Sequence, residues 1–529
     1  MFEYEKNQQL SAYANSYLES MCNLQIMSES FESRQTGIVC TIGPVSRDVE
    51  KLIQLMKAGM TIARMNFSHG THDYHRETIN NVRVAAARFG RPIAIALDTK
   101  GPEIRTGILK GGVNTEVILT ANSRVKIHTD NSMMEKCDES NIWLDYKNIT
   151  KVVNIGDCIY VDDGIMTLRV EKKDNTTLDC TVVGPGSLGS KKGCNLPGVD
   201  VDLPAVSKKD IEDLKFGLEM DVDMVFASFI RDKGGVKAIK DILGEKGQHI
   251  MIIPKIENQQ GIKNFDDILD VSDGIMVARG DLGIEIPIYK VFMAQKMMIS
   301  KCMLKRKPSI CATQMLESMV SKPRPTRAEC SDVANAVLDG ADCVMLSGET
   351  AKGIYPAETV EIMSKICCEA ETASYYRRFK EELTSLHLKS GPVSPAIAAA
   401  VSCVNAADSI DAKLIIVMTT SGQSATFISS LRPRCSIIAV TRNARTARQL
   451  LLYKGILPLH YQNERANEWL NDVDGRVVWS MKWAIDNKLS KKGDYVIIVT
   501  GWKKGSGATN TCRIVQVPQD FSTFHLVSQ

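Results

Sequence analysis

Eight short runs rich in β-branched and apolar residues alternate along the chain with segments of helical character, and this alternation restricts the possible folds most strongly. We expect strands at Gly37–Ile42, Thr61–Phe67, Ile93–Leu97, Met224–Ile230, Ile250–Ile256, Gly274–Val277, Ser309–Thr313 and Cys343–Leu346. Several runs are apolar almost throughout, which is typical of parallel strands buried on both faces. Eight βα repeats are the number that closes a TIM barrel, so the sequence predicts an α/β protein built on a (β/α)8 barrel.

A segment with a different pattern interrupts the third repeat. It contains short alternating runs separated by turn signals such as Asp162-Asp163-Gly164. The runs lie at Val125–His128, Cys158–Val161, Met166–Val170 and Leu178–Val183. We therefore expect an inserted β domain at residues 103–203, with the barrel formed by residues 29–102 and 204–373.

The pattern changes again after residue 373. An alanine-rich helical stretch at Pro395–Ala407 precedes further apolar runs at Leu414–Thr419, Ser436–Thr441, Tyr495–Thr500 and Cys512–Val517. These features predict a second α/β domain at residues 374–529. Residues 1–28 are polar with weak helical spacing, and we interpret them as an N-terminal arm.

Charge and cysteine content exclude several classes of protein. The chain has 65 basic and 62 acidic side chains, a net charge of +3, so neither a nucleic-acid nor a membrane partner is expected. No apolar run approaches the ~20 residues of a membrane span, and the start does not resemble a signal peptide. The 15 cysteines are scattered without a CxxC pair, which favours a reducing, cytoplasmic location.

Polar and charged residues gather at the carboxyl ends of five expected barrel strands, where the active site of such a barrel lies. They occur in Arg64–Gly70, Asp98–Arg105, Lys255–Glu257, Arg279–Asp281 and Thr313–Gln314. A single arginine or aspartate at a strand end is as often structural as functional. A set spread over five strand ends is much harder to explain by structure alone.

The residue types in this set favour phosphoryl transfer. Glu257 and Asp281 are the kind of carboxylate pair that magnesium prefers, together with substrate oxygens. Lysine and arginine can neutralise the oxygens of a phosphoryl group in a loose transition state. No serine–histidine or cysteine–histidine pairing occurs at these strand ends, so acyl transfer fits less well.

Seven segments resemble the signature segments of the pyruvate kinase family. They are Arg64–Gly70, Leu97–Gly107, Lys255–Asn258, Met276–Pro287, Ile310–Met319, Pro323–Gly340 and Leu346–Gly353. The resemblance runs in the same order from about residue 16 to residue 518, and the stretch 322–329 (KPRPTRAE) is highly specific by itself. It implies transfer of the phosphoryl group of phosphoenolpyruvate to ADP, giving pyruvate and ATP in the last step of glycolysis.

The resemblance implies a role for each matching residue. Lys255 would stabilise the transferring phosphoryl group, with Arg64 and Thr313 as further catalytic residues. Phosphoenolpyruvate would contact Arg64, Gly280, Asp281 and Thr313. Magnesium would be held by Glu257 and Asp281, and potassium by Asn66, Ser68, Asp98 and Thr99. Nucleotide contacts would come from Asn66, Phe67, Ser68, His69, Arg105 and Lys192, and the inserted domain would act as a closing lid.

Three segments of the last domain resemble the effector pocket of regulated members of this family. The residues are Thr419, Thr420, Ser421, Gly422, Gln423, Ser424, Trp469, Arg476, Lys503, Lys504, Gly505, Ser506, Gly507 and Ala508. Hydroxyls and backbone N–H groups at a helix start suit a phosphate, and the resemblance implies fructose 1,6-bisphosphate as the effector. Thr420 and Gln423 lack the positive charge that is common at these places, so only weak to moderate activation is expected.

The resemblance also implies a homotetramer and a need for potassium, since Glu103 stands where potassium-dependent members carry glutamate. Two other interpretations remain beside an active pyruvate kinase. One is a catalytically weak relative that serves as a binding protein, although every required catalytic residue is present. The other is a different phosphoenolpyruvate enzyme on a similar barrel, against which the insert and the extra domain argue.

Overall fold

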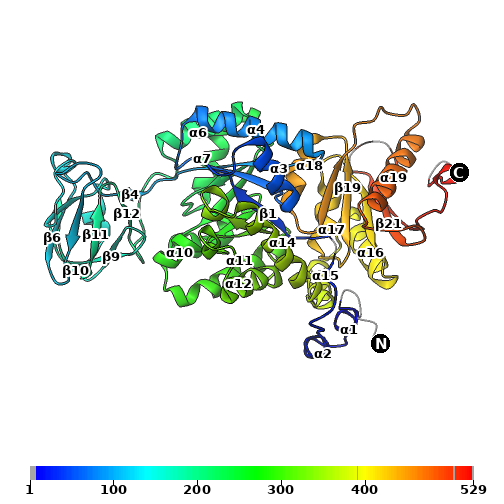
Figure 1. Ribbon diagram of the computed structural model, residues 1–529, viewed down its shortest axis with the longest axis horizontal. Helices are drawn as coiled ribbons and strands as arrows, with labels where there is room; N and C mark the ends of the chain where they lie inside the picture. The colour runs from blue at the N-terminus through cyan, green and yellow to red at the C-terminus, as the bar shows by residue number, and fades with distance from the viewer. Residues whose placement is uncertain (1–7, 32, 390, 504, 506, 527–529) are drawn as a thin grey trace.

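The computed structural model describes residues 8–31, 33–389, 391–503, 505 and 507–526 of the chain. Figure 1 shows three bodies in a row, with the inserted β domain at one end, the barrel in the middle and the C-terminal domain at the other end. The short N-terminal helices α1 (Gln9–Ala12) and α2 (Tyr17–Cys22) lie beside α15 (Tyr376–Lys389).

Each of the eight expected runs forms one strand of a closed parallel barrel. The strands are β1 (Gly37–Thr41), β2 (Ile62–Asn66), β3 (Ala94–Asp98), β13 (Met224–Ala227), β14 (Met251–Ile256), β15 (Ile275–Ala278), β16 (Ser309–Ala312) and β17 (Cys343–Leu346). They follow one another around the ring in chain order, and β1 closes it by pairing with β17. The predicted (β/α)8 barrel is confirmed.

Helices cover the outside of the barrel. They are α3 (Val49–Ala58), α4 (His72–Phe89), α6 (Lys208–Glu219), α7 (Lys233–Leu243), α8 (Gln259–Lys263), α9 (Phe265–Val271), α10 (Arg279–Glu285), α11 (Val291–Leu304), α12 (Arg327–Leu338), α13 (Gly348–Ala351) and α14 (Pro356–Thr372). Capping boxes define the starts of two of them, because Ser207 and Asp210 satisfy the first N–H groups of α6 and Thr326 and Glu329 those of α12.

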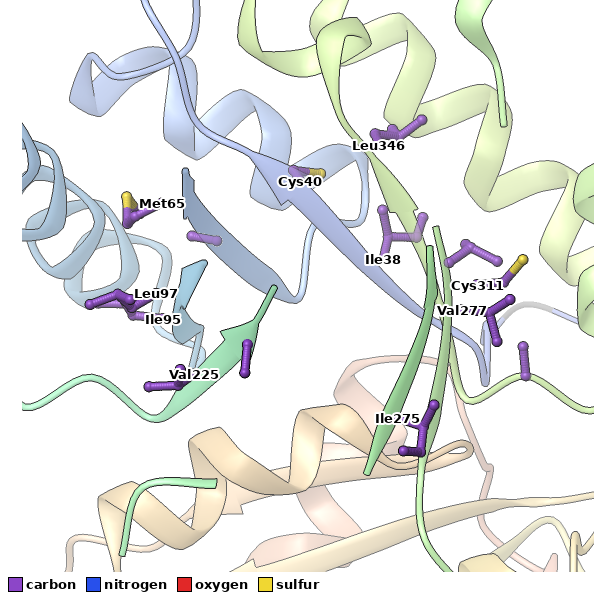
Figure 2. Close-up of a cluster of buried hydrophobic side chains, with 14 of the residues drawn as sticks. Ile38, Cys40, Met65, Ile95, Leu97, Val225, Ile275, Val277, Cys311 and Leu346 are labelled. Carbon is purple, nitrogen blue, oxygen red and sulfur yellow. The ribbon is translucent and has the colours of Figure 1, made fainter. Parts of the chain in front are cut away.

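The barrel strands are apolar on both faces because each face packs against a different core. Outward-facing side chains such as Ile38, Met65 and Leu346 belong to the cluster beneath the helices (Figure 2). Inward-facing side chains such as Phe226 and Met276 fill the barrel interior, and Leu452 of the last domain packs with them. The barrel is therefore a packed core, and its chemistry is confined to the strand ends.

The inserted domain is built from short, mostly antiparallel strands around its own apolar core. Its elements are β4 (Ile104–Arg105), β5 (Glu116–Leu119), β6 (Arg124–His128), β7 (Asn141–Trp143), α5 (Ile149–Val152), β8 (Cys158–Val161), β9 (Met166–Lys173), β10 (Thr177–Gly184), β11 (Gly186–Gly189) and β12 (Gly193–Asn195). The four expected runs correspond to β6, β8, β9 and β10. Figure 1 shows that it joins the barrel only through the chain segments next to β4 and β12.

The C-terminal domain has a five-stranded sheet in the order β20–β19–β18–β21–β22. Its elements are α16 (Pro395–Ser409), β18 (Leu414–Met418), α17 (Gln423–Ser430), β19 (Ser436–Thr441), α18 (Ala444–Gln449), β20 (Ile456–His460), α19 (Trp469–Asp486), β21 (Tyr495–Gly501) and β22 (Thr509–Gln516). The strand β20 was not expected because it contains Pro458 and lacks strand periodicity. It lies at the sheet edge, where a proline is tolerated.

The helix α15 packs with the barrel rather than with the C-terminal sheet. Its Leu383 belongs to the barrel's outer cluster, and Phe379 packs against the same cluster. The sequence-based boundary at residue 374 assigns this helix to the last domain, and the four domain boundaries stay a prediction. Within the described residues, no helix is both long and apolar enough to cross a membrane.

Candidate active site

The ends of β2 and β3 bring an arginine and an aspartate into a buried ion pair. The two strands are in parallel register, with Asn66 opposite Asp98. Arg64 Nε lies 2.5 Å from Asp98 Oδ2, and its Nη1 donates to Thr41 Oγ1 at 2.8 Å. Burial alone would raise the pKa of Asp98, but the charges of Arg64 and Lys255 outweigh it and lower that pKa. The aspartate is therefore held ionised between two cations.

The lysine at the end of β14 lies at the centre of the strand-end residues. Lys255 Nζ is 3.0 Å from Glu257 Oε1, 3.3 Å from Asp98 Oδ1 and 2.9 Å from Ser228 Oγ. Burial disfavours its charge, yet the two carboxylates prevail and the pKa of Lys255 is raised. A lysine that stays charged with only 11% of its side chain exposed is suited to stabilising a phosphoryl group in transfer.

Glu257, which is buried, and Asp281, which is half-buried, are neighbouring carboxyl groups that interact electrostatically. The pKa of Glu257 is raised to about 7, first by burial and then by the neighbouring Asp281, while Lys255 opposes the shift. The pKa of Asp281 is also raised, mainly by burial. Two like charges this close are unfavourable alone, and a divalent cation between them would remove the conflict. The pair therefore fits magnesium.

The backbone at the end of β16 is strained. Thr313 has φ of 72° and Gln314 has φ of 54°, and a β-branched residue rarely adopts positive φ. Thr313 Oγ1 accepts a hydrogen bond from Gly280 N at 2.7 Å, while Arg279 holds Thr313 O at 2.8 Å and pairs with Asp332. Such strain persists where the surroundings impose it, typically at ligand sites. Gly280 and Thr313, both predicted site residues, therefore lie together.

The fourth barrel strand contributes a residue that the sequence analysis missed. Ser228, just after β13, accepts from Lys255 Nζ and donates to Thr99 O at 2.6 Å, and its Oγ lies 3.2 Å from Asp98 Oδ1. The next residue, Phe229, has φ of 54°, and its N–H donates to Glu257. The position at a barrel strand end was the available signal, but a small hydroxyl residue without a charged neighbour in the sequence did not attract attention.

The four residues expected to hold potassium lie at the ends of the adjacent strands β2 and β3. Asn66 Oδ1 accepts from Ser68 N at 3.1 Å, which folds the end of β2 into a tight turn. Thr99 Oγ1 accepts from Ser228 N at 3.0 Å. Amide, hydroxyl and carboxylate oxygens of this kind are ligands for a hard cation, so the set fits a potassium ion.

The residues expected to contact nucleotide belong to two separate parts of the structure. Lys192 and Arg105 lie in the inserted domain and pair with its own carboxylates, Lys192 with Asp162 at 2.8 Å and Arg105 with Glu103 at 2.5 Å. They line a cleft of about 330 Å³ between that domain and the barrel, which Asp281 also lines. A nucleotide phosphate would have to compete with these carboxylates.

The other nucleotide residues form the loop after β2. His69 is exposed and Ser68 half-buried, whereas the side chain of Phe67 is buried with 1% of the residue exposed. Phe67 can therefore offer a ligand only its backbone, and its ring serves the packing behind the loop.

Comparisons with known proteins give a consistent result. The family model "Pyruvate kinase, barrel domain" matches residues 33–360, and "Pyruvate kinase, alpha/beta domain" matches residues 397–515. The chain is 52% identical over 522 residues to pyruvate kinase PKLR of Homo sapiens, covering 97% of this chain and 90% of that protein. It is 51% identical over 485 residues to pyruvate kinase of Candida albicans, covering 91% and 95%.

The chain belongs to the pyruvate kinase family.

Membership in the pyruvate kinase family makes this chain a phosphotransferase, as the strand-end chemistry predicted. The similarity extends over nearly the whole chain, and Lys255, which is expected to be catalytic, lies beside Glu257 and Asp98. A binding protein derived from this family is therefore not favoured, and neither is a different phosphoenolpyruvate enzyme.

The first effector segment lies between β18 and α17 of the pyruvate kinase C-terminal domain. Thr419 is buried and its Oγ1 accepts from Gly422 N at 3.0 Å, while Thr420, Ser421 and Gln423 are exposed. Ser424 is half-buried in the first turn of α17. Gly422 has φ of 86°, a conformation that glycine adopts readily. The exposed hydroxyls at this helix start are available to a phosphate group.

The second and third effector segments differ in how accessible they are. Arg476 pairs with Asp472 on its own helix at 3.0 Å and has 14% of its side chain exposed, so it is not a free cation. Trp469 is half-buried at the start of α19. In the last segment Lys503 and Gly505 are exposed and Ala508 is buried, and Gly507 has positive φ. Lys504 and Ser506 lie outside the described residues.

Proposed function

We propose that this chain transfers the phosphoryl group of phosphoenolpyruvate to ADP at the carboxyl ends of the barrel strands, in the last step of glycolysis. Phosphoenolpyruvate is oriented by Arg64, Asp281 and Thr313, together with the backbone of Gly280. Lys255 faces the phosphoryl group and stabilises the negative charge that spreads over its oxygens during transfer. The observation that carries this proposal is the position of the Lys255 ammonium, which is buried between two carboxylates and still charged.

The carboxylate pair and the polar ends of β2 and β3 support two cation sites. Glu257 and Asp281 would hold magnesium, and Asn66, Ser68, Asp98 and Thr99 would hold potassium. Bound there, the cations supply positive charge that neutralises substrate oxygens. The residues themselves orient the substrate and exclude water, since Asp98 and Glu257 are almost fully buried.

The inserted domain is proposed to close over the substrates. Lys192 and Arg105 are paired with Asp162 and Glu103, and in the closed state each cation exchanges its carboxylate for nucleotide phosphate. Closure of a domain in this way completes the site and removes water from it.

A coupled assay tests the proposed reaction. Purified protein is mixed with phosphoenolpyruvate, ADP, magnesium and potassium, and pyruvate is followed through its reduction by lactate dehydrogenase. Formation of pyruvate and ATP in equal amounts, abolished by chelating the magnesium, is the expected result. Absence of pyruvate from folded protein under these conditions contradicts the proposal.

A homotetramer of cytoplasmic subunits is proposed as the working form. Four exposed apolar side chains on the short turn before α11 and on its first residues support self-association. Ile288, Tyr289, Phe292 and Met293 are 77, 72, 57 and 50% exposed. All fifteen cysteines are unpaired, which suits a reducing compartment.

Light scattering is expected to report a mass of four subunits. Phe292→Glu is expected to lower that mass, because a charge in an apolar contact must be desolvated. An unchanged mass would remove this surface from the interface.

Fructose 1,6-bisphosphate is proposed as an activator bound in the C-terminal domain. The helix start at Thr419–Ser424 offers hydroxyls and N–H groups, and Arg476 would have to leave Asp472 to reach a second phosphate. This competition, together with the neutral Thr420 and Gln423, supports a weak to moderate response. The effector is expected to lower the apparent constant for phosphoenolpyruvate without raising the maximal rate.

Two opposite substitutions at the exposed Thr420 test this pocket. Thr420→Glu is expected to abolish activation, since a carboxylate repels phosphate, and Thr420→Lys to strengthen it several-fold through a new charge-assisted contact. Arg476→Ala should also lose the response. Saturation curves for phosphoenolpyruvate with and without the bisphosphate, together with calorimetry, measure the effect. Unchanged curves and no heat of binding for the unmodified protein would show that the pocket is not used.

A further inference from the structure

The loop at the end of β2, residues 66–69, is hydrogen-bonded by side chains that the proposed reaction does not use. We propose that Lys209 and His75 are positioning residues, each of which fixes one backbone carbonyl of this loop so that its other face can hold nucleotide and potassium. The inference rests on the proposed role of the loop and adds the residues that keep it in place.

Lys209 fixes the carbonyl of Phe67. Its Nζ donates to Phe67 O at 2.7 Å and pairs with Asp213 Oδ2 at 2.7 Å. Asp213 is buried, with 1% of the residue exposed, and its other oxygen lies 2.7 Å from Nε2 of His72. The ammonium is therefore held between a fixed carboxylate and the loop, and it connects positions 142 residues apart in sequence.

His75 fixes the carbonyl of His69. Its Nε2 lies 2.8 Å from His69 O, and because a carbonyl only accepts, this nitrogen must carry the hydrogen. The imidazole also stacks on the ring of Phe67, with centroids 4.0 Å apart and an interplanar angle of 14°. His75 of α4 therefore contacts both the carbonyl of His69 and the ring of Phe67.

The two positioning residues come from helices that flank the loop. His75 lies in α4 and Lys209 in the first turn of α6, and these helices lie side by side along the same edge of the barrel (Figure 1). The capping box of Ser207 and Asp210 fixes the start of α6 and therefore the place from which Lys209 reaches. Within the loop, Ser68 N and His69 N donate to Asn66.

This arrangement matters because a ligand-binding loop must be placed to within a fraction of an ångström. A displacement of about 1 Å in a positioning group can cost roughly 100-fold in rate. Asn66 and Ser68 alternate in the loop with Phe67 and His69, whose carbonyls are held. Loss of either contact is expected to affect the ligands of this loop. The phosphoenolpyruvate contacts should be unaffected, because Gly280 and Thr313 lie at the ends of β15 and β16 and Arg64 is fixed by Asp98 and Thr41.

Lys209→Met is the first test, because it keeps the length of the side chain and removes the donor. The apparent KM for ADP and the activation constant for potassium are expected to rise about tenfold, with the KM for phosphoenolpyruvate within about twofold of the unmodified value. Lys208→Met is the matched control. It removes an exposed charge one position away and is expected to leave all three constants unchanged.

His75 allows its two contacts to be separated. His75→Phe keeps a ring against Phe67 and loses the donor to His69 O, whereas His75→Gln keeps a donor and loses the ring. We expect His75→Phe to raise the KM for ADP and His75→Gln to restore most of the affinity. Melting curves of each variant show whether the fold is retained.

The outcomes separate this inference from the proposed role of the loop. Asn66→Ala changes the loop directly. If it raises the KM for ADP while Lys209→Met and His75→Phe do not, the positioning role is overturned and the loop keeps its function. If Asn66→Ala has no effect either, the assignment of the loop fails as well. An equal loss for both substrates with a large drop in melting temperature would mean that Lys209 and His75 serve only the stability of the fold, and would also overturn the inference.

Discussion

Lys255→Met is expected to lower the turnover number by at least roughly two to three orders of magnitude, about 3–4 kcal/mol in the barrier. The ammonium lies among Asp98, Glu257 and Ser228, where it stays charged despite its burial. A phosphoryl group in transfer carries spread negative charge, and the ammonium stabilises that charge more in the transition state than in the bound substrate. Binding of phosphoenolpyruvate should therefore change far less than turnover.

The measurement must separate catalysis from folding. Removing Lys255 leaves the buried Glu257 without its cation, although Asp98 keeps Arg64, and breaking a buried pair in this way can cost about 3–5 kcal/mol of stability. Turnover is therefore measured on protein whose circular dichroism and melting curve show that it is folded. Lys263→Met serves as the control, because Lys263 is an exposed lysine on α8 that pairs with Asp200, away from Lys255 and its carboxylates. A folded Lys255→Met variant with near-normal turnover would exclude the lysine from this role.

Activity is expected to depend on potassium. Replacing potassium by tetramethylammonium, which is too large for an oxygen-lined site, should lower the rate by at least about tenfold, or about 1.4 kcal/mol. The reason is that Asn66, Ser68, Asp98 and Thr99 present oxygens at the ends of two adjacent strands. Steady-state rates at constant ionic strength measure the effect. Full activity in tetramethylammonium would contradict it.

Glu103→Lys tests the same requirement from the protein side. Glu103 pairs with Arg105, and its charge contributes to the raised pKa of Asp281, so it lies near the carboxylates of the site. An ammonium at this position can replace the charge of the monovalent ion, and the need for potassium is expected to weaken. Glu135→Lys makes the same charge change at an exposed position of the inserted domain and should leave the requirement unchanged. Equal dependence in all three proteins would exclude Glu103.

Much of the barrel and its site could be predicted because a closed parallel barrel converts chain order into position. Once eight strands are recognised, their carboxyl ends must meet on one face. Residues such as Lys255, Glu257 and Asp281 are then expected to lie close together, and the Lys255–Glu257 ion pair and the electrostatic interaction between the two carboxyl groups agree with this. The strand β20 could not be predicted in this way, because Pro458 disrupts the pattern and only its edge position makes the strand possible.

The sequence by itself determined the strand count, the inserted domain and the set of charged residues at the strand ends, because hydrophobic periodicity and residue type are local properties. Only the tertiary structure decided which of these charged groups are already paired with an opposite charge. Arg105, Lys192 and Arg476 carry the charges expected of phosphate ligands, yet each is paired with a carboxylate. Ser228 joined the site, and Lys209 reached the carbonyl of Phe67, through contacts between distant parts of the chain. Such contacts depend on how the helices and strands pack against one another, and no local pattern encodes them.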